Sequence, residues 1–236
     1  RKTMSKSSEE IKTSVTLEVP IPEEPEIPGT LGILPVRGMV FYPKLTLPLM
    51  IGKPKSLKLI DEILPGDEKM IAVVTVRDDS DEKIDSDPQD LYETGTAVRI
   101  LRMAKVLPDR YQVLAQALAR VRIKKVIGSD PYITAEVEAV PEELAEDAEV
   151  LAMVTNIKSQ FRKWAQLKGV PEQILQIVDQ EEDVLTLCYL LAAQLTISVP
   201  EHQAILEADS VKDKLRSVTK ALTHEVANLS LAEEIQ

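Results

Sequence analysis

Apolar and polar positions alternate along residues 110–124, and this is the clearest pattern in the chain. The apolar residues fall mostly at every second position from Tyr111 to Ile123, and the intervening positions are mainly Arg, Lys and Gln. A period of two is typical of a β-strand, and so long a run indicates a strand that curves through a barrel. Because a turn signal at Pro108-Asp109 precedes it, residues 95–125 predict a pair of antiparallel strands.

Shorter apolar runs before and after this pair predict further strands. They are separated by Gly and Pro and lie at residues 31–36, 45–50, 70–76 and 132–140. Residues 56–64 have apolar positions at helical spacing instead, and Pro65-Gly66 ends that predicted helix. Residues 31–140 therefore predict a β domain that contains one helix.

The spacing becomes helical after Pro141. Pro141-Glu142-Glu143 is typical of a helix start, because Pro fits the first turn and carboxylates favour the positive end of the helix dipole. Apolar residues then follow at intervals of three and four before a stop at Gly169: Val150, Val154, Ile157, Phe161 and Trp164. Further helices are predicted at 181–195, at 200–208 and from Ser210 onward. The apolar stripe of the last helix is still running at Gln236, so we expect a helical domain at 141–236 whose last helix continues in a longer protein.

Residues 1–30 differ from both predicted domains in composition. Prolines and glutamates alternate there, which predicts a flexible or extended leader. The net charge of −11 disfavours nucleic acid as a partner. No apolar run reaches the roughly 20 residues of a membrane span, and the single cysteine fits a reducing compartment. We therefore expect a cytoplasmic chain that binds neither membrane nor nucleic acid through this region.

A search for catalytic or cofactor chemistry finds no convincing motif. A phosphate-binding loop needs glycines before Lys and Ser/Thr, and Gly52-Lys53-Pro54 lacks them. Cys188, His202 and His224 lie on different helical segments, which favours structural roles over a zinc site. A Cys–His nucleophile pair stays open only because both residue types are present. We expect no catalytic residue, metal or cofactor in this chain.

Two surfaces are candidates for binding a partner. The first is an apolar loop at residues 38–45, in which large side chains near Gly and Pro favour contact with extended or unfolded chains: Met39, Val40, Phe41, Tyr42 and Leu45. The alternative is that these residues belong to the core. The second is a basic strand face, represented by Arg120, Arg122 and Lys124, which could meet a polyanion or be a solvated outer face.

Four stretches of the chain resemble the Lon family of ATP-dependent proteases. LPVRGMVFYPKLTLPLMIGKPKS is similar to the opening of the family's N-terminal substrate-binding domain, and three other stretches match in the same order: DLYETGTAVRI, YQVLAQALARVRI and the helical pair LCYLLAAQL with PEHQAILEADSVKDKL. They lie at 34–56, 90–100, 111–123, 187–195 and 200–215. The resemblance therefore spans most of residues 31–236.

The resemblance implies an α+β fold, with a PUA-like β-barrel or sandwich followed by a helical bundle that ends in a long helix. It also implies a parent protein with an AAA+ module that binds ATP and Mg, a Ser–Lys protease module and a hexameric assembly. This region would capture unfolded or damaged proteins for those modules. The alternative is a standalone PUA-like protein that binds RNA or an acidic partner, and a hydrolase in its own right is disfavoured by the missing motifs.

Overall fold

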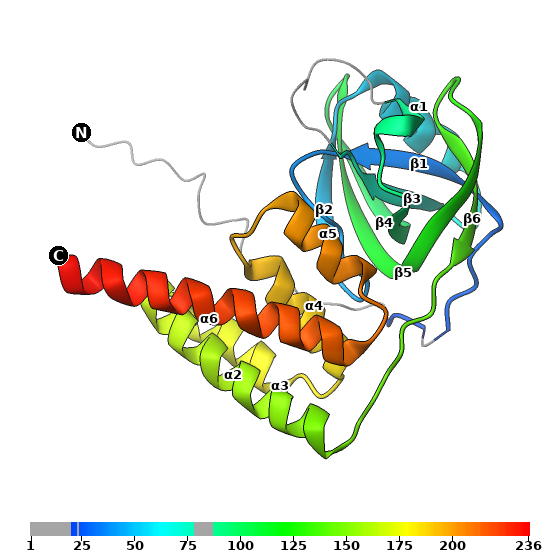
Figure 1. Ribbon diagram of the computed structural model, residues 1–236. Helices are drawn as coiled ribbons and strands as arrows, with labels where there is room; N and C mark the ends of the chain where they lie inside the picture. Colours follow the sequence, from blue (N-terminus) through cyan, green and yellow to red (C-terminus); the bar gives the residue numbers. More distant parts are fainter. Residues whose placement is uncertain (1–19, 23, 78–86) are drawn as a thin grey trace, which may run out of the picture.

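The computed structural model describes residues 20–22, 24–77 and 87–236, which form a β part and a helical part that pack against each other (Figure 1). This confirms the predicted α+β order. The predicted leader lies largely outside the described residues. Within the described part of the leader, only Thr30, the first residue of β1, lies in a strand, and Ile21 and Ile27 pack on the β core.

Six strands form one sheet in the order β2-β5-β4-β3-β1-β6, and β6 also pairs with β5, which closes a barrel. The strands are β1 Thr30–Val36, β2 Thr46–Ile51, β3 Met70–Thr75, β4 Thr94–Leu107, β5 Arg110–Gly128 and β6 Thr134–Ala139. The length of β5 makes the closure possible, because its first half pairs with β2 and its second half with β6. Register shifts along the β4–β5 ladder bend the pair. The predicted curved strand is confirmed.

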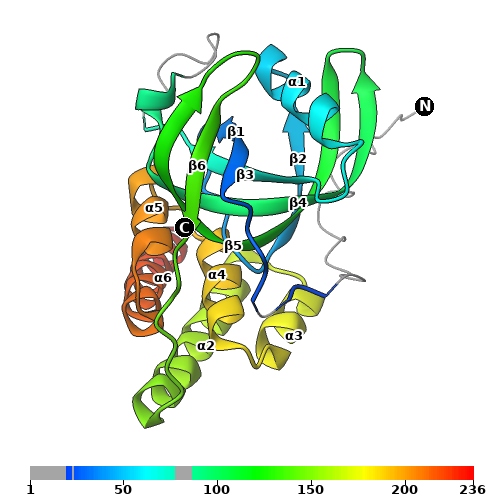
Figure 2. The same cartoon turned by 90° about the vertical axis from the view of Figure 1, so that its right-hand side faces the viewer.

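Helix α1, Pro54–Ile63, lies between two hairpins that rise from the same end of the barrel (Figure 2). One is formed by β4 and β5, and the other by β5 and β6. Its apolar face is buried through Leu59 and Ile60. On one side the Tyr111 hydroxyl of β5 donates to Asp61 of α1 at 2.9 Å. On the other side Lys55 Nζ donates to the Ser129 carbonyl in the β5–β6 turn at 3.0 Å. Helix α1 therefore contacts both hairpins near their turns.

The helical part contains five α-helices within the described residues: α2 Ala148–Lys168, α3 Glu172–Gln180, α4 Val184–Gln194, α5 Val199–Glu207 and α6 Val211–Ile235. The two long helices α2 and α6 lie side by side (Figure 1), and Trp164 Nε1 donates to Glu225 across them at 2.7 Å. Ser210 caps α6 as predicted, with its hydroxyl accepting from Asp213 N. Gly169 ends α2 with a φ of 70°, which only glycine adopts at little cost.

Two helical predictions need correction. Pro141-Glu142-Glu143 is not a helix start, because α2 begins at Ala148 with Asp147 as its N-cap. Residues 141–147 form an extended connector instead, in which the Glu143 carbonyl accepts from Val211 N and Glu143 N donates to the Asp209 carbonyl. Those contacts with the start of α6 compete with helix formation. Helix α3 lies in a stretch for which no helix was predicted.

Candidate functional site

The apolar loop at residues 38–45 lies between the β part and the helical part. Phe41 is buried in the β core, whereas Tyr42 and Leu45 belong to the core of the helical part. The exposed fractions of these side chains are 2%, 1% and 6%. The expectation of an exposed patch is therefore wrong for these three residues, because the β core covers Phe41 and the helical part covers Tyr42 and Leu45. Met39 and Val40 are half-buried, each packed against one of the two cores.

Tyr42 joins the two parts through stacking and hydrogen bonding. Its ring stacks on Tyr189 of α4 with 5.2 Å between ring centroids. Its hydroxyl oxygen lies 2.7 Å from Nδ1 of His202 and 3.1 Å from the His202 carbonyl oxygen. Burial raises the pKa of Tyr42 and lowers the pKa of His202, so both stay neutral near pH 7. His202 therefore serves a structural role at this seam, as the sequence indicated.

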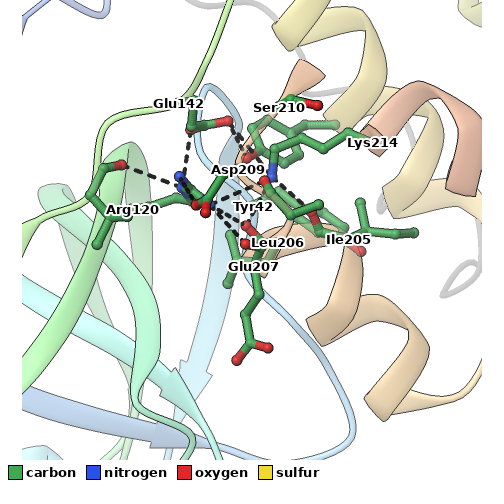
Figure 3. Close-up of polar contacts among 12 residues, drawn as sticks. Tyr42, Arg120, Glu142, Ile205, Leu206, Glu207, Asp209, Ser210 and Lys214 are labelled. Carbon is green, nitrogen blue, oxygen red and sulfur yellow. Dashed lines mark hydrogen bonds and ion pairs between the residues drawn. The ribbon is translucent and has the colours of Figure 1, made fainter. Parts of the chain in front are cut away.

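Arg120 of β5 makes the second connection between the parts (Figure 3). Its side chain is 1% exposed. Nη1 donates to the carbonyls of Leu206, Glu207 and Ala208 at 3.0, 3.3 and 3.2 Å, and Nη2 donates to the Pro141 carbonyl at 2.8 Å. A guanidinium at the negative end of α5 satisfies carbonyls that the helix itself leaves unpaired. The prediction that Arg120 lies on an exposed basic face is wrong, because α5 packs onto that face.

Lys214 of α6 approaches the same end of α5 from the helical side (Figure 3). Its Nζ donates to the carbonyls of Ile205 and Leu206 at 2.7 and 2.8 Å, and its side chain is fully buried. Burial lowers the pKa of Lys214 to about 8, although Glu142 opposes that shift. Two cations from different parts of the molecule thus meet at the end of one helix.

Glu142 supplies the buried negative charge for both cations. Its carboxylate lies 3.7 Å from Arg120 Nε and 3.8 Å from Lys214 Nζ, and it accepts from the Tyr189 hydroxyl at 2.6 Å. Burial, and then the Glu142 charge, raise the pKa of Tyr189 well above its usual value. Because every one of these groups is paired, the arrangement is a structural connection and offers no reactive group.

The remaining predicted polyanion residues, Arg122 and Lys124, are exposed. Arg122 Nε lies 3.2 Å from Glu138 Oε1 of the neighbouring strand, which partly neutralises it. With Arg120 buried, the predicted basic face does not exist as one continuous surface.

Sequence reasoning missed the exposed apolar side chains at the ends of the two hairpins beside α1. Leu107, at the end of β4, is 50% exposed, and Ile127, near the end of β5, is 55% exposed. Three neighbours on the same two hairpins and on β2 are also exposed: Val106, Val126 and Met50. We call these five residues the hairpin tips. A signal was present, since two adjacent apolar residues stand immediately before Pro108 and before Gly128, where a turn leaves no core to cover them.

Catalytic and metal chemistry gain no support from the described residues. Cys188 is fully buried, and burial raises the pKa of its thiol to about 12, which makes it a poor nucleophile. Within residues 20–22, 24–77 and 87–236, no cluster of three His, Cys, Asp or Glu side chains could hold a metal ion. In the same part of the chain, no helix is long and apolar enough to cross a membrane.

Comparison with known proteins identifies the family. The substrate-binding domain of ATP-dependent protease La (LON) matches residues 30–224. Lon protease 2 of Syntrophobacter fumaroxidans is 34% identical over 210 residues, which cover 89% of this chain and 26% of that protein. Lon protease of Trichlorobacter lovleyi is 33% identical over 235 residues, which cover 99% of this chain and 28% of that protein. The chain thus spans about a quarter of the length of these relatives.

Solved structures show the same fold. The N-terminal domain of Mycobacterium avium complex Lon protease superposes with a TM-score of 0.68 at 16% identity, over 82% of this chain and 98% of that chain. The Lon N-terminal domain protein from Xanthomonas campestris gives a TM-score of 0.54 at 18% identity, over 80% and 96%. The chain belongs to the Lon substrate-binding domain family.

Proposed function

We propose that this chain captures unfolded or damaged proteins through the hairpin tips and presents them to the ATPase and protease modules of a Lon protease. Family membership supports substrate recognition, and the exposure of the tips supports their role in it. Apolar side chains that are half-exposed in adjacent pairs are costly in water, and contact with an apolar segment of a substrate would cover them. The exposure of Leu107 and Ile127 is the observation that carries this assignment.

The rest of the proposal concerns the longer protein. ATP and Mg would bind in an AAA+ module, hydrolysis of peptide bonds would occur at a Ser–Lys dyad, and six copies would assemble in the cytoplasm. Six sets of tips around one ring would raise the avidity of contacts that are weak singly. RNA is disfavoured as the partner, because Arg120 is buried and the chain carries a net charge of −11.

The test compares binding of an unfolded protein with binding of its native form. Reduced, carboxymethylated α-lactalbumin is the unfolded probe, and native α-lactalbumin is the folded form used for comparison. The double substitution Leu107→Asp/Ile127→Asp places a charge on each hairpin, and we expect it to weaken binding of the unfolded probe at least about fivefold. Hydrogen exchange on the unsubstituted chain should show protection at 104–110 and 124–130.

The matched control is Leu144→Asp/Leu151→Asp, which changes two leucines of similar exposure on the connector and on α2. It should leave affinity unchanged. Equal losses in the two double variants would show that exposed apolar residues act without regard to position. If Leu107→Asp/Ile127→Asp binds the unfolded probe with unchanged affinity, the hairpin tips do not take part in substrate binding.

A further inference from the structure

Cationic side chains accompany the apolar residues on both hairpins. Residues 102–110, at the end of the β4–β5 hairpin, contain three Arg or Lys and one Asp, a formal charge of +2. Residues 122–138 of the β5–β6 hairpin contain three Arg or Lys and three Asp or Glu, since Glu138 and Glu136 of β6 lie opposite Arg122 and Lys125. The whole chain carries −11. All six cations are exposed: Arg102, Lys105, Arg110, Arg122, Lys124 and Lys125. The β4–β5 hairpin is therefore a positive end on a negative molecule, and the β5–β6 hairpin is neutral overall but presents exposed lysines beside Val126 and Ile127.

Most of this positive charge is available to a ligand. Arg122 is paired with Glu138, and Lys105 Nζ lies 5.4 Å above the Tyr111 ring. Among the described residues, no carboxylate lies within 4 Å of Lys124 or Lys125. Both lysines directly precede Val126 and Ile127 in the sequence, just as Lys105 precedes Val106 and Leu107. A ligand that covers the apolar pairs would thus bring its flanking residues beside these cations.

We propose that the hairpin tips select apolar segments flanked by Asp or Glu and discriminate against segments flanked by Lys or Arg. This inference rests on the proposed function of the tips. Opposite charges beside an apolar contact strengthen binding modestly, and like charges weaken it. The net negative charge of the chain adds to the selection, because it disfavours acidic ligands on surfaces that lack such cations.

An anionic lipid surface is a poorer match for the same residues. A membrane in contact with both tips would also face α1, which lies between them (Figure 2). Asp61 and Glu62 are exposed on that helix, and they would be placed against anionic headgroups. A peptide avoids this repulsion, since its apolar centre can cross α1 while its acidic flanks lie at the hairpins.

The test uses two peptides with the same apolar centre, one flanked by aspartates and the other by lysines. Titration of the full chain by fluorescence anisotropy should give an affinity about fivefold higher for the aspartate-flanked peptide, the factor that two exposed ion pairs supply. The ratio should fall when the salt concentration rises from about 0.05 M to about 0.5 M, because screening weakens exposed pairs.

Charge-reversed variants then assign the preference to the hairpins. Lys105→Glu/Lys124→Glu should abolish or invert the ratio, and Lys163→Glu/Lys220→Glu, an equal change of charge on α2 and α6, should preserve it. Equal affinities of the two peptides would overturn the preference while leaving substrate capture intact. Failure of both peptides to bind would refute the proposed function and this inference with it. Binding to phosphatidylglycerol vesicles that Lys105→Glu/Lys124→Glu abolishes, without peptide discrimination, would assign the hairpins to a lipid surface and overturn the inference.

Discussion

Replacement of Glu142 by Gln tests the buried connection between the β part and the helical part. The substitution keeps the size of the side chain and leaves an oxygen that can still accept from the Tyr189 hydroxyl. It removes the charge that lies 3.7 Å from Arg120 and 3.8 Å from Lys214. The Glu142 side chain is only 9% exposed, so water does not replace the lost charge.

The expected loss in the free energy of unfolding is about 3 kcal/mol. Removing one partner of a buried ion pair typically costs about 3–5 kcal/mol, because the other charge stays buried without compensation. The lower end applies here for two reasons. Asp209 still lies 3.2 Å from Arg120 Nη2, and Lys214, with a pKa already near 8, can lose its proton once Glu142 no longer favours the charged form.

Urea unfolding at pH 7 provides the measurement. Trp164 is the only tryptophan and is buried in the helical part, so its fluorescence reports that part, while far-ultraviolet circular dichroism reports the whole chain. With a slope of about 2–3 kcal/mol per M, the midpoint should fall by roughly 1 M. Glu146→Gln, on the same connector but exposed, is the control and should change little. A midpoint in Glu142→Gln that equals that of the control would refute the charge argument. Exact additivity with Lys214→Met in a double-mutant cycle would refute the coupling between them.

Three further changes test other parts of the structure. The unfolded state binds the Lys214 proton up to its usual pKa of 10.5 while the folded state releases it near 8, so stability should rise with pH in this window. The gain from pH 7 to 9, relative to Lys214→Met, should be about 1.4 kcal/mol in urea titrations, and a flat difference would contradict the assigned pKa. Tyr42→Phe keeps the stacking on Tyr189 but leaves His202 Nδ1 without its partner, which should lower stability by about 1–2 kcal/mol; an unchanged urea midpoint would mean that the hydroxyl is dispensable. Gly169→Ala forces a side chain into a φ of 70° and should lower the melting temperature at a cost of about 1 kcal/mol, whereas equal melting temperatures would show that the end of α2 can rearrange.

The strands were predictable because their signal is local. The alternation around Tyr111 and the length of that run lie within one segment, and β5 has the predicted course. The Gly169 stop and the Ser210 cap were predictable for the same reason, since each depends on the conformation of a few neighbouring residues.

The partners of a surface were not predictable, because they come from distant segments. Arg120 occupies a polar position of an alternating strand, and only the docking of α5, 86–88 residues later, buries it. The apolar neighbours of Tyr42 in the sequence fit an exposed binding loop and a buried core equally well. Its burial depends on contact with His202, which lies 160 residues away in the sequence. The helix predicted to start at Pro141 does not form for the same reason, because hydrogen bonds with the start of α6 hold the connector extended.

Strand β5 carries both hairpins and the guanidinium anchor on one continuous backbone. Its first residue, Arg110, belongs to one hairpin, its residues 126 and 127 belong to the other, and Arg120 lies between them. A substrate that is pulled away from either hairpin would therefore transmit tension along a single hydrogen-bonded strand to the end of α5, with no loop in the path to stretch. The hydrogen bonds from Arg120 to the α5 carbonyls would then carry part of that load from the barrel to the helices.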